Sequence, residues 1–158
     1  MARSALILSA VAVSFLAALP AARAGDPPPA SYDAELAAQL GGDDYGMRPY
    51  IFVLLRTGPA TIEDPAHLSA LFAGHFANMT RLAEEGALVL AGPLSDIGDK
   101  RGLFILNAPS IEAAKEMVAA DPAVAAGLFT AEYSGYYGSA ALLRLNAIHK
   151  TIQRKAIE

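Results

Sequence analysis

The 158-residue chain contains no cysteine and no tryptophan. The absence of cysteine excludes a disulfide, a thiolate zinc site, an iron–sulfur cluster and a cysteine nucleophile within this sequence. It also leaves no cysteine that could carry a lipid anchor. Charged side chains are also sparse, with 12 basic against 16 acidic residues. Since no basic cluster interleaved with aromatic residues is present, we expect no nucleic-acid partner.

Motifs for metal binding and for serine catalysis are missing as well. The three histidines, His67, His75 and His149, stand far apart and lack H-E-x-x-H spacing, so we predict no metal site and no cofactor. Gly138-Ser139-Ala140 lacks the pattern G-x-S-x-G and does not predict a nucleophile elbow. His67 and His149 fall on the polar faces of predicted helices, where we expect them to be exposed.

Residues 1–24 have the pattern of a secretory signal peptide. Arg3 precedes an apolar run of fifteen residues, 5–19, and Ala22-Arg23-Ala24 has the small-x-small pattern of a cleavage site. An uncleaved anchor is the alternative, but a membrane span needs roughly 20 residues. We therefore expect a periplasmic or secreted protein that has no membrane association after the signal peptide is cleaved.

Residues 25–49 read as a proline-rich leader with a short helix. Pro27-Pro28-Pro29 predicts a stiff, solvated spacer. Ser31 is expected to cap a helix that ends at Gly41-Gly42. We expect this arm to dock on the following domain through one face of the helix, which carries Tyr32, Leu36 and Leu40.

The domain proper is predicted over residues 50–138, followed by an amphipathic C-terminal helix over 139–158. Apolar, β-branched and aromatic runs predict strands at 50–56, 87–91, 102–107 and 128–137. Asp64-Pro65 and Ser110 predict the starts of helices that reach about residues 85 and 120. The order β-α-β-β-α-β predicts a ferredoxin-like α+β sandwich, in which two helices cover one face of a four-stranded antiparallel sheet.

Both faces of this sheet are expected to be apolar. Ile51 and Val53 alternate with Phe52 and Leu54, whereas a strand with one wet face should alternate apolar with polar side chains. Two helices can cover only one face, so the second face needs another cover. We predict a homodimer with the two sheets face to face; the alternative cover is the C-terminal helix folding back.

His75 lies in the middle of the apolar stripe of the first long helix. At ~100° per residue it shares one side of the helix with Leu71, Phe72 and Met79. A histidine at such a position is either a core residue with satisfied hydrogen bonds or part of a site.

The segments YIFVLLRTGP, HFANMTRLAEEG, LVLAGPL, RGLFIL and AAKEMVAADPAVAAGLFTAE together resemble the YCII-related (YciI-like) family. That resemblance implies a dimeric α/β-barrel arrangement of ferredoxin-like units, similar to muconolactone isomerases. It also implies a histidine and an aspartate as catalytic residues, here His75 and Asp121. A carboxylate beside an imidazole fixes its tautomer and raises its basicity.

Each candidate residue also has a structural explanation. Asp121-Pro122 is an ordinary start for a short helical turn, although capping and catalysis can coexist in one aspartate. Arg56 could bind a substrate carboxylate or simply be solvated at a strand end. Ser95 and Asp96 follow another strand and could contact a ligand or form a plain turn.

Two functions remain open from the sequence. The first is a cofactor-independent lyase or isomerase in which His75 is a general acid/base acting on a small organic molecule and Asp121 orients it. The second is a non-catalytic periplasmic module that binds a small ligand or a partner. The enzyme hypothesis requires that His75 opens to a solvent-reachable cavity and lies within hydrogen-bond distance of Asp121.

Overall fold

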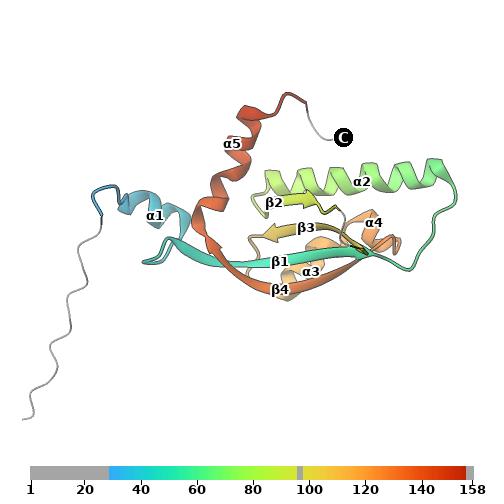
Figure 1. Ribbon diagram of the computed structural model, residues 1–158, viewed down its shortest axis with the longest axis horizontal. Coiled ribbons are helices and arrows are strands. Elements are labelled where there is room, and N and C mark those ends of the chain that lie inside the picture. Colours follow the sequence, from blue (N-terminus) through green and yellow to red (C-terminus); the bar gives the residue numbers. More distant parts are fainter. Residues whose placement is uncertain (1–28, 96–97, 156–158) are drawn as a thin grey trace, which may run out of the picture. The chain divides into compact units, whose positions relative to one another are not determined.

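A computed structural model of the chain describes residues 29–95 and 98–155 (Figure 1). The predicted signal peptide, residues 1–24, and Asp96 lie outside the described residues. Asp33–Glu158 forms one compact unit, which holds all of the helices and strands described here. Within the described ranges no helix combines the length and the apolar character needed to cross a membrane.

This unit is built on one antiparallel sheet of four strands. These are β1 (Met47–Thr57), β2 (Leu88–Pro93), β3 (Lys100–Leu106) and β4 (Phe129–Ser139), arranged in the order β2-β3-β1-β4. β1 is central and pairs with β3 on one side and β4 on the other. This topology, with helices after β1 and β3, confirms the predicted ferredoxin-like α+β fold.

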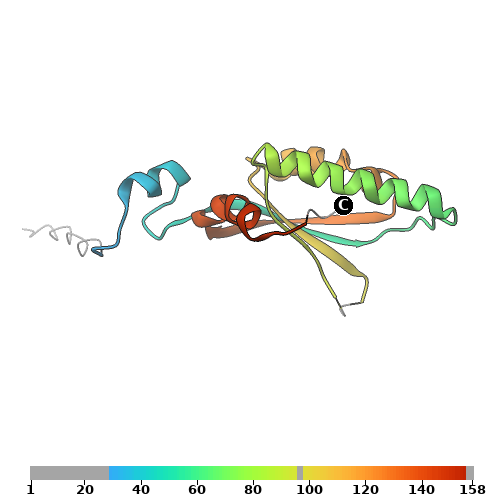
Figure 2. The same ribbon diagram turned by 90° about the horizontal axis from the view of Figure 1, so that it is seen from above.

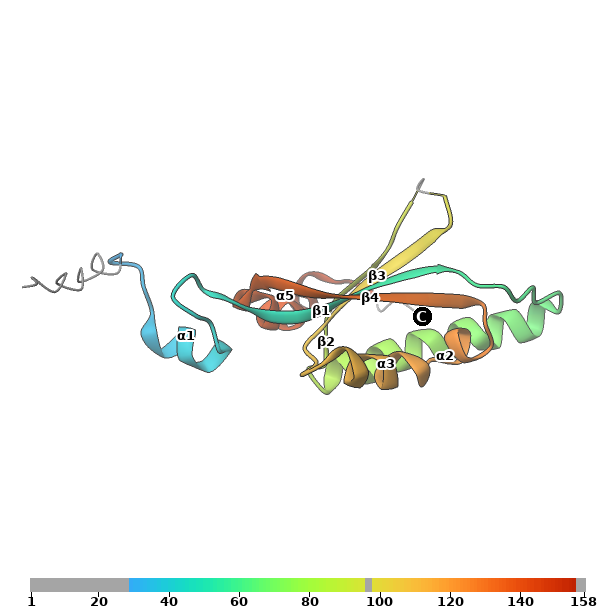
Figure 3. The same cartoon turned by 90° about the horizontal axis from the view of Figure 1, so that it is seen from below.

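Two helices, α2 (Pro65–Glu84) and α3 (Ile111–Ala119), lie on the same side of the sheet (Figures 2 and 3). Both begin where the sequence predicts, because Asp64 and Ser110 accept hydrogen bonds from backbone amides of the first turn. Their apolar sides pack on alternate residues of the strands. The core between them contains Ile51, Val53, Leu55, Leu82, Phe104, Leu106, Ala114 and Val118.

The other face of the sheet has a second, smaller core of Tyr50, Val89 and Ile105. Leu142 and Leu143 pack against it. The C-terminal segment, predicted as a single helix, consists of a 3₁₀ helix, η1 (Ala140–Arg144), and then α5 (Leu145–Ile152). The alternative cover considered above is therefore present over this part of the face, while another part, formed by Phe52, Leu54 and Leu103, is only half-buried.

The segment before the sheet differs in detail from the prediction. The first helix, α1 (Ala34–Leu40), is capped by Asp33, whose carboxylate accepts from the Leu36 amide, so the prediction that Ser31 is the cap is wrong. α1 ends at Gly41 as predicted, in a left-handed conformation, but it buries none of its residues. β1 begins at Met47, inside the predicted leader.

Candidate active site

His75 and Asp121 meet on the helix side of the sheet. The imidazole Nδ1 lies 2.6 Å from a carboxylate oxygen of Asp121, although 46 positions separate the two residues in sequence. The Asp121 side chain is fully buried and that of His75 is 10% exposed. A contact this short between an imidazole and a carboxylate is a charge-assisted hydrogen bond, in a setting that excludes most water.

Asp121 is held by its local backbone. It is the N-cap of a short helix, α4 (Pro122–Ala125), and its Oδ1 accepts from the Ala123 amide at 2.9 Å. Its other oxygen, Oδ2, faces His75. One carboxylate thus caps a helix and orients an imidazole at the same time, so its two oxygens are divided between the two roles.

A glycine lets α4 approach α2 closely enough for this contact. A Cβ atom at Gly74 would lie 2.8 Å from Cγ of Pro122, inside any normal contact distance. Glycine in the middle of a helix costs roughly 0.5–1 kcal/mol relative to alanine, so its presence beside His75 calls for a packing reason. We infer that Gly74 sets the spacing that brings Asp121 to His75.

Phenylalanine rings surround the His75 imidazole. Phe104 from β3 stacks on it with ring centroids 6.1 Å apart. Phe76 and Phe129 lie at 5.6 and 5.5 Å in tilted arrangements. This apolar surround strengthens the electrostatic interaction between His75 and Asp121, because little water is present to screen it.

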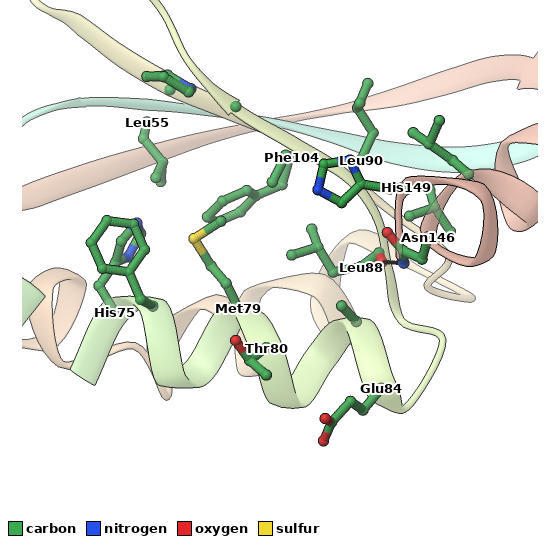
Figure 4. A pocket seen from close by; sticks show the side chains of 18 of the residues that line it. Leu55, His75, Met79, Thr80, Glu84, Leu88, Leu90, Phe104, Asn146 and His149 are labelled. Atoms are coloured by element: carbon green, nitrogen blue, oxygen red, sulfur yellow. Dashed lines mark hydrogen bonds between the residues drawn. The ribbon is translucent and has the colours of Figure 1, made fainter. Parts of the chain in front are cut away.

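His75 also lines a cavity of about 820 Å³ (Figure 4). Its walls come from α2, β2, β3 and α5, with apolar side chains such as Leu88, Leu90 and Met79 predominating. A cavity of this size is in the range of small-molecule sites, which typically have a mostly apolar lining and a few polar groups. His75 is one of those polar groups.

The hydrogen bonding of His75 leaves one ring nitrogen available. An ionised carboxylate can only accept, so Nδ1 carries the proton that is shared with Asp121. Nε2 makes no hydrogen bond to any residue in the described ranges. In the neutral ring Nε2 then holds a lone pair, which is the arrangement that a general base requires.

The weaker candidates lie elsewhere. Arg56 is on the opposite face of β1 from Leu55, and its guanidinium is bound to Asp99 at 2.9 Å and Glu132 at 2.7 Å. Hydrogen bonding to Glu132 raises the pKa of Arg56 above its usual value. Ser95 is exposed and, like Arg56, is not part of the cavity lining, and Asp96 lies outside the described residues. Substrate binding by these three residues stays a prediction.

The cavity also has lining residues that sequence reasoning missed. His149 is exposed, as predicted, but together with Asn146 and Lys150 of α5 it faces the cavity opposite α2. Only the spacing of these polar residues on one side of a helix could have suggested this arrangement. In the part of the chain that the structure describes, no three His, Asp or Glu side chains are grouped so as to hold a metal ion.

Comparison with known proteins gives a family match and weaker structural likenesses. The sequence model of the YCII-related domain family matches residues 50–133 of this chain. One solved structure to which this chain is similar is that of 5-chloro-2-hydroxyhydroquinone dehydrochlorinase from Burkholderia phenoliruptrix AC1100, in complex with 2,5-dihydroxybenzoquinone. It is 24% identical, covers 53% of this chain and 90% of that chain, and has a TM-score of 0.37. No curated protein matches.

Proposed function

This chain belongs to the YCII-related domain family, and we propose that it is a cofactor-independent enzyme of the lyase or isomerase type. Its substrate would be a small organic molecule with an acidic C–H or O–H group. His75 would be the general acid/base, and Asp121 would fix its tautomer and stabilise its protonated form.

One observation carries the proposal: the Nδ1 of a cavity-lining His75 is 2.6 Å from the buried Asp121 carboxylate. The sequence left a non-catalytic binding module as the alternative. The enzyme hypothesis required that His75 opens to a cavity and also lies within hydrogen-bond distance of Asp121. A histidine that served only the core would have no need of an unpartnered Nε2 beside a cavity. The geometry therefore favours the enzyme.

The proposed step is a proton transfer. Nε2 takes a proton from the substrate, and the electron pair of the broken bond stays on the substrate as an enolate or phenolate. In a lyase that pair expels a leaving group, chloride in a dehydrochlorination. In an isomerase, such as one acting on a lactone, His75 returns the proton to a different carbon. In both cases the imidazolium formed transiently is stabilised by Asp121. In the lyase it then gives its proton to water, so that the net loss is HCl and the neutral base is restored.

A matched pair of histidine variants tests this proposal. The protein is incubated in deuterium oxide with small cyclic ketones, unsaturated lactones and chlorinated hydroxyphenols, and NMR follows deuterium incorporation and product formation. His75→Gln should reduce the observed rate by about 10²- to 10⁴-fold, the usual contribution of general acid–base catalysis. His67→Gln, on the same helix but exposed and outside the cavity lining, should not. Equal rates in the two variants would refute the proposal.

We also propose a homodimer, with the half-buried part of the second sheet face at the interface. Phe52, Leu54 and Leu103 form an apolar area there that the C-terminal segment leaves partly open. Burial of such an area in a partner is a common source of dimer stability. Sedimentation of the unmodified protein at micromolar concentration tests this, and a monomer would contradict it.

Export remains a proposal that rests on the sequence pattern of residues 1–24. Intact-mass analysis of the protein from the periplasm or the medium should give a chain that begins at Gly25. A soluble cytoplasmic form that keeps Met1 would contradict it.

A further inference from the structure

α5 and its C-cap, Gln153, border the cavity with mostly polar side chains. Asn146, His149, Lys150 and Gln153, spaced by three, four and seven residues, line the cavity. On the outer side Ile148 and Ile152 are 57% and 71% exposed. His149, Lys150 and Gln153 are exposed as well, so they line the cavity at its solvent-facing edge. A surface helix normally turns its apolar side toward the protein, yet Ile148 and Ile152 are directed away from the cavity.

A specific contact fixes this orientation. The side-chain amide of Asn146 donates to the backbone oxygen of Leu88 on β2 at 2.7 Å, and Figure 4 shows this bond at the edge of the cavity. The ring of His149 extends from α5 toward the sheet, beside Leu90 (Figure 4). The first turn of α5 is thereby anchored to the edge strand, and the two basic residues of its last turn lie over the cavity.

The charges at the cavity favour an anion. Lys150 and Arg101 are the cationic lining residues, Glu84 is the acidic one, and His149 adds a neutral or cationic N–H donor. Arg101 already donates through Nε to Thr57, so Lys150 and His149 are the donors with the greatest freedom to bind a ligand. Basic residues in a last turn complement the helix dipole, but that effect does not require them to face a cavity.

We propose that His149 and Lys150 form an anion subsite, and that the substrate class is an apolar, ring-sized carboxylic acid. Its carboxylate lies between His149 and Lys150, its ring lies against Met79 and Phe104, and its acidic hydrogen is directed toward His75. This inference rests on the proposed function and adds the substrate class to it. Because the matched family domain ends at residue 133, the subsite belongs to a segment that follows the domain.

Two probes of equal shape and different charge test the subsite. Binding of 2-naphthoate and of the uncharged 2-naphthamide is measured by titration calorimetry and by amide shifts in NMR. In the wild type we expect naphthoate to bind at least tenfold more tightly than naphthamide, with shifts at α5. The double variant His149→Gln/Lys150→Gln should lose this preference and keep its affinity for naphthamide.

Lys115→Gln is the matched control, since Lys115 is an exposed lysine on α3 outside the cavity lining. It should keep the preference for naphthoate. Equal binding of the two probes by the wild type, binding of neither at millimolar concentration, or a preference that survives in the double variant would each overturn the subsite.

The outcomes separate this inference from the proposed function. If the naphthoate preference is absent but proton exchange still depends on His75, only the subsite is wrong. If the preference is present and depends on α5 while no exchange depends on His75, the cavity binds acids and the catalytic proposal falls.

Discussion

Replacing Gly74 by alanine perturbs the His75–Asp121 contact without touching either residue. The new Cβ would lie 2.8 Å from Cγ of Pro122 and 3.2 Å from its Cβ, and a proline ring cannot rotate away. α4 must therefore move outward by several tenths of an ångström, and Asp121, its N-cap, moves with it. The 2.6 Å contact with Nδ1 should lengthen or break.

The expected effect on stability is small because two terms oppose each other. Alanine gains about 1 kcal/mol of helix propensity over glycine, whereas overpacking costs typically 1–3 kcal/mol. We expect a net destabilisation of about 0–2 kcal/mol by urea unfolding. Catalysis should suffer far more, since a misplacement of about 1 Å in a catalytic group can cost on the order of 10²-fold in rate.

The assay combines unfolding, His75-dependent proton exchange and the NMR signal of the proton between His75 and Asp121. The control is Ala77→Gly on the exposed side of the same helix, which should lose about 1 kcal/mol and keep both the signal and the exchange rate. If Gly74→Ala kept the proton signal and the full rate, Gly74 would have no role in spacing the pair.

Three further predictions follow from particular contacts. Asp121→Asn keeps a good N-cap but loses a charge-assisted hydrogen bond, so the free energy of unfolding should fall by about 1–3 kcal/mol; an unchanged urea midpoint would contradict this. Arg48→Ala removes hydrogen bonds to the Leu40 carbonyl at 2.8 Å and to Asn107 at 3.0 Å, so the free energy of unfolding should fall by about 2 kcal/mol or more. Amide hydrogen exchange should become faster at the end of α1, and unaltered exchange there would count against the contact. Leu54→Lys should convert the proposed dimer to a folded monomer, detected by sedimentation, because the charge would be buried in the interface; a dimer of unchanged affinity would place the interface elsewhere.

Local signals in the sequence predict most of this fold. Asp64-Pro65, Ser110 and Asp121-Pro122 each mark a helix start, because a side-chain oxygen before the first turn satisfies a free amide wherever it occurs. Alternation in β1 shows that both faces of the sheet are apolar. The position of His75 within an apolar stripe was also sufficient to identify it as unusual.

Contacts made by distant residues were not predictable in the same way. Nothing near Gly74 in sequence indicates that Pro122 packs against it, since that contact depends on how α4 meets α2. The apolar pattern of the second face requires a cover but does not say which part of it Leu142 and Leu143 pack against. Which side of α5 borders the cavity depends on a bond from Asn146 to Leu88, a contact that helical periodicity alone does not indicate.

We propose that His75 is a base whose proton sits on Nδ1, shared with Asp121, and whose Nε2 makes no hydrogen bond within the described residues. Two-bond ¹H–¹⁵N correlation spectra measure this directly by distinguishing the two neutral tautomers of the ring. Neutral His75 should be the Nδ1–H tautomer, and the tautomer population should change in Asp121→Asn, where an amide replaces the carboxylate. A neutral ring protonated on Nε2, or a His75 signal indifferent to Asp121→Asn, would contradict this assignment.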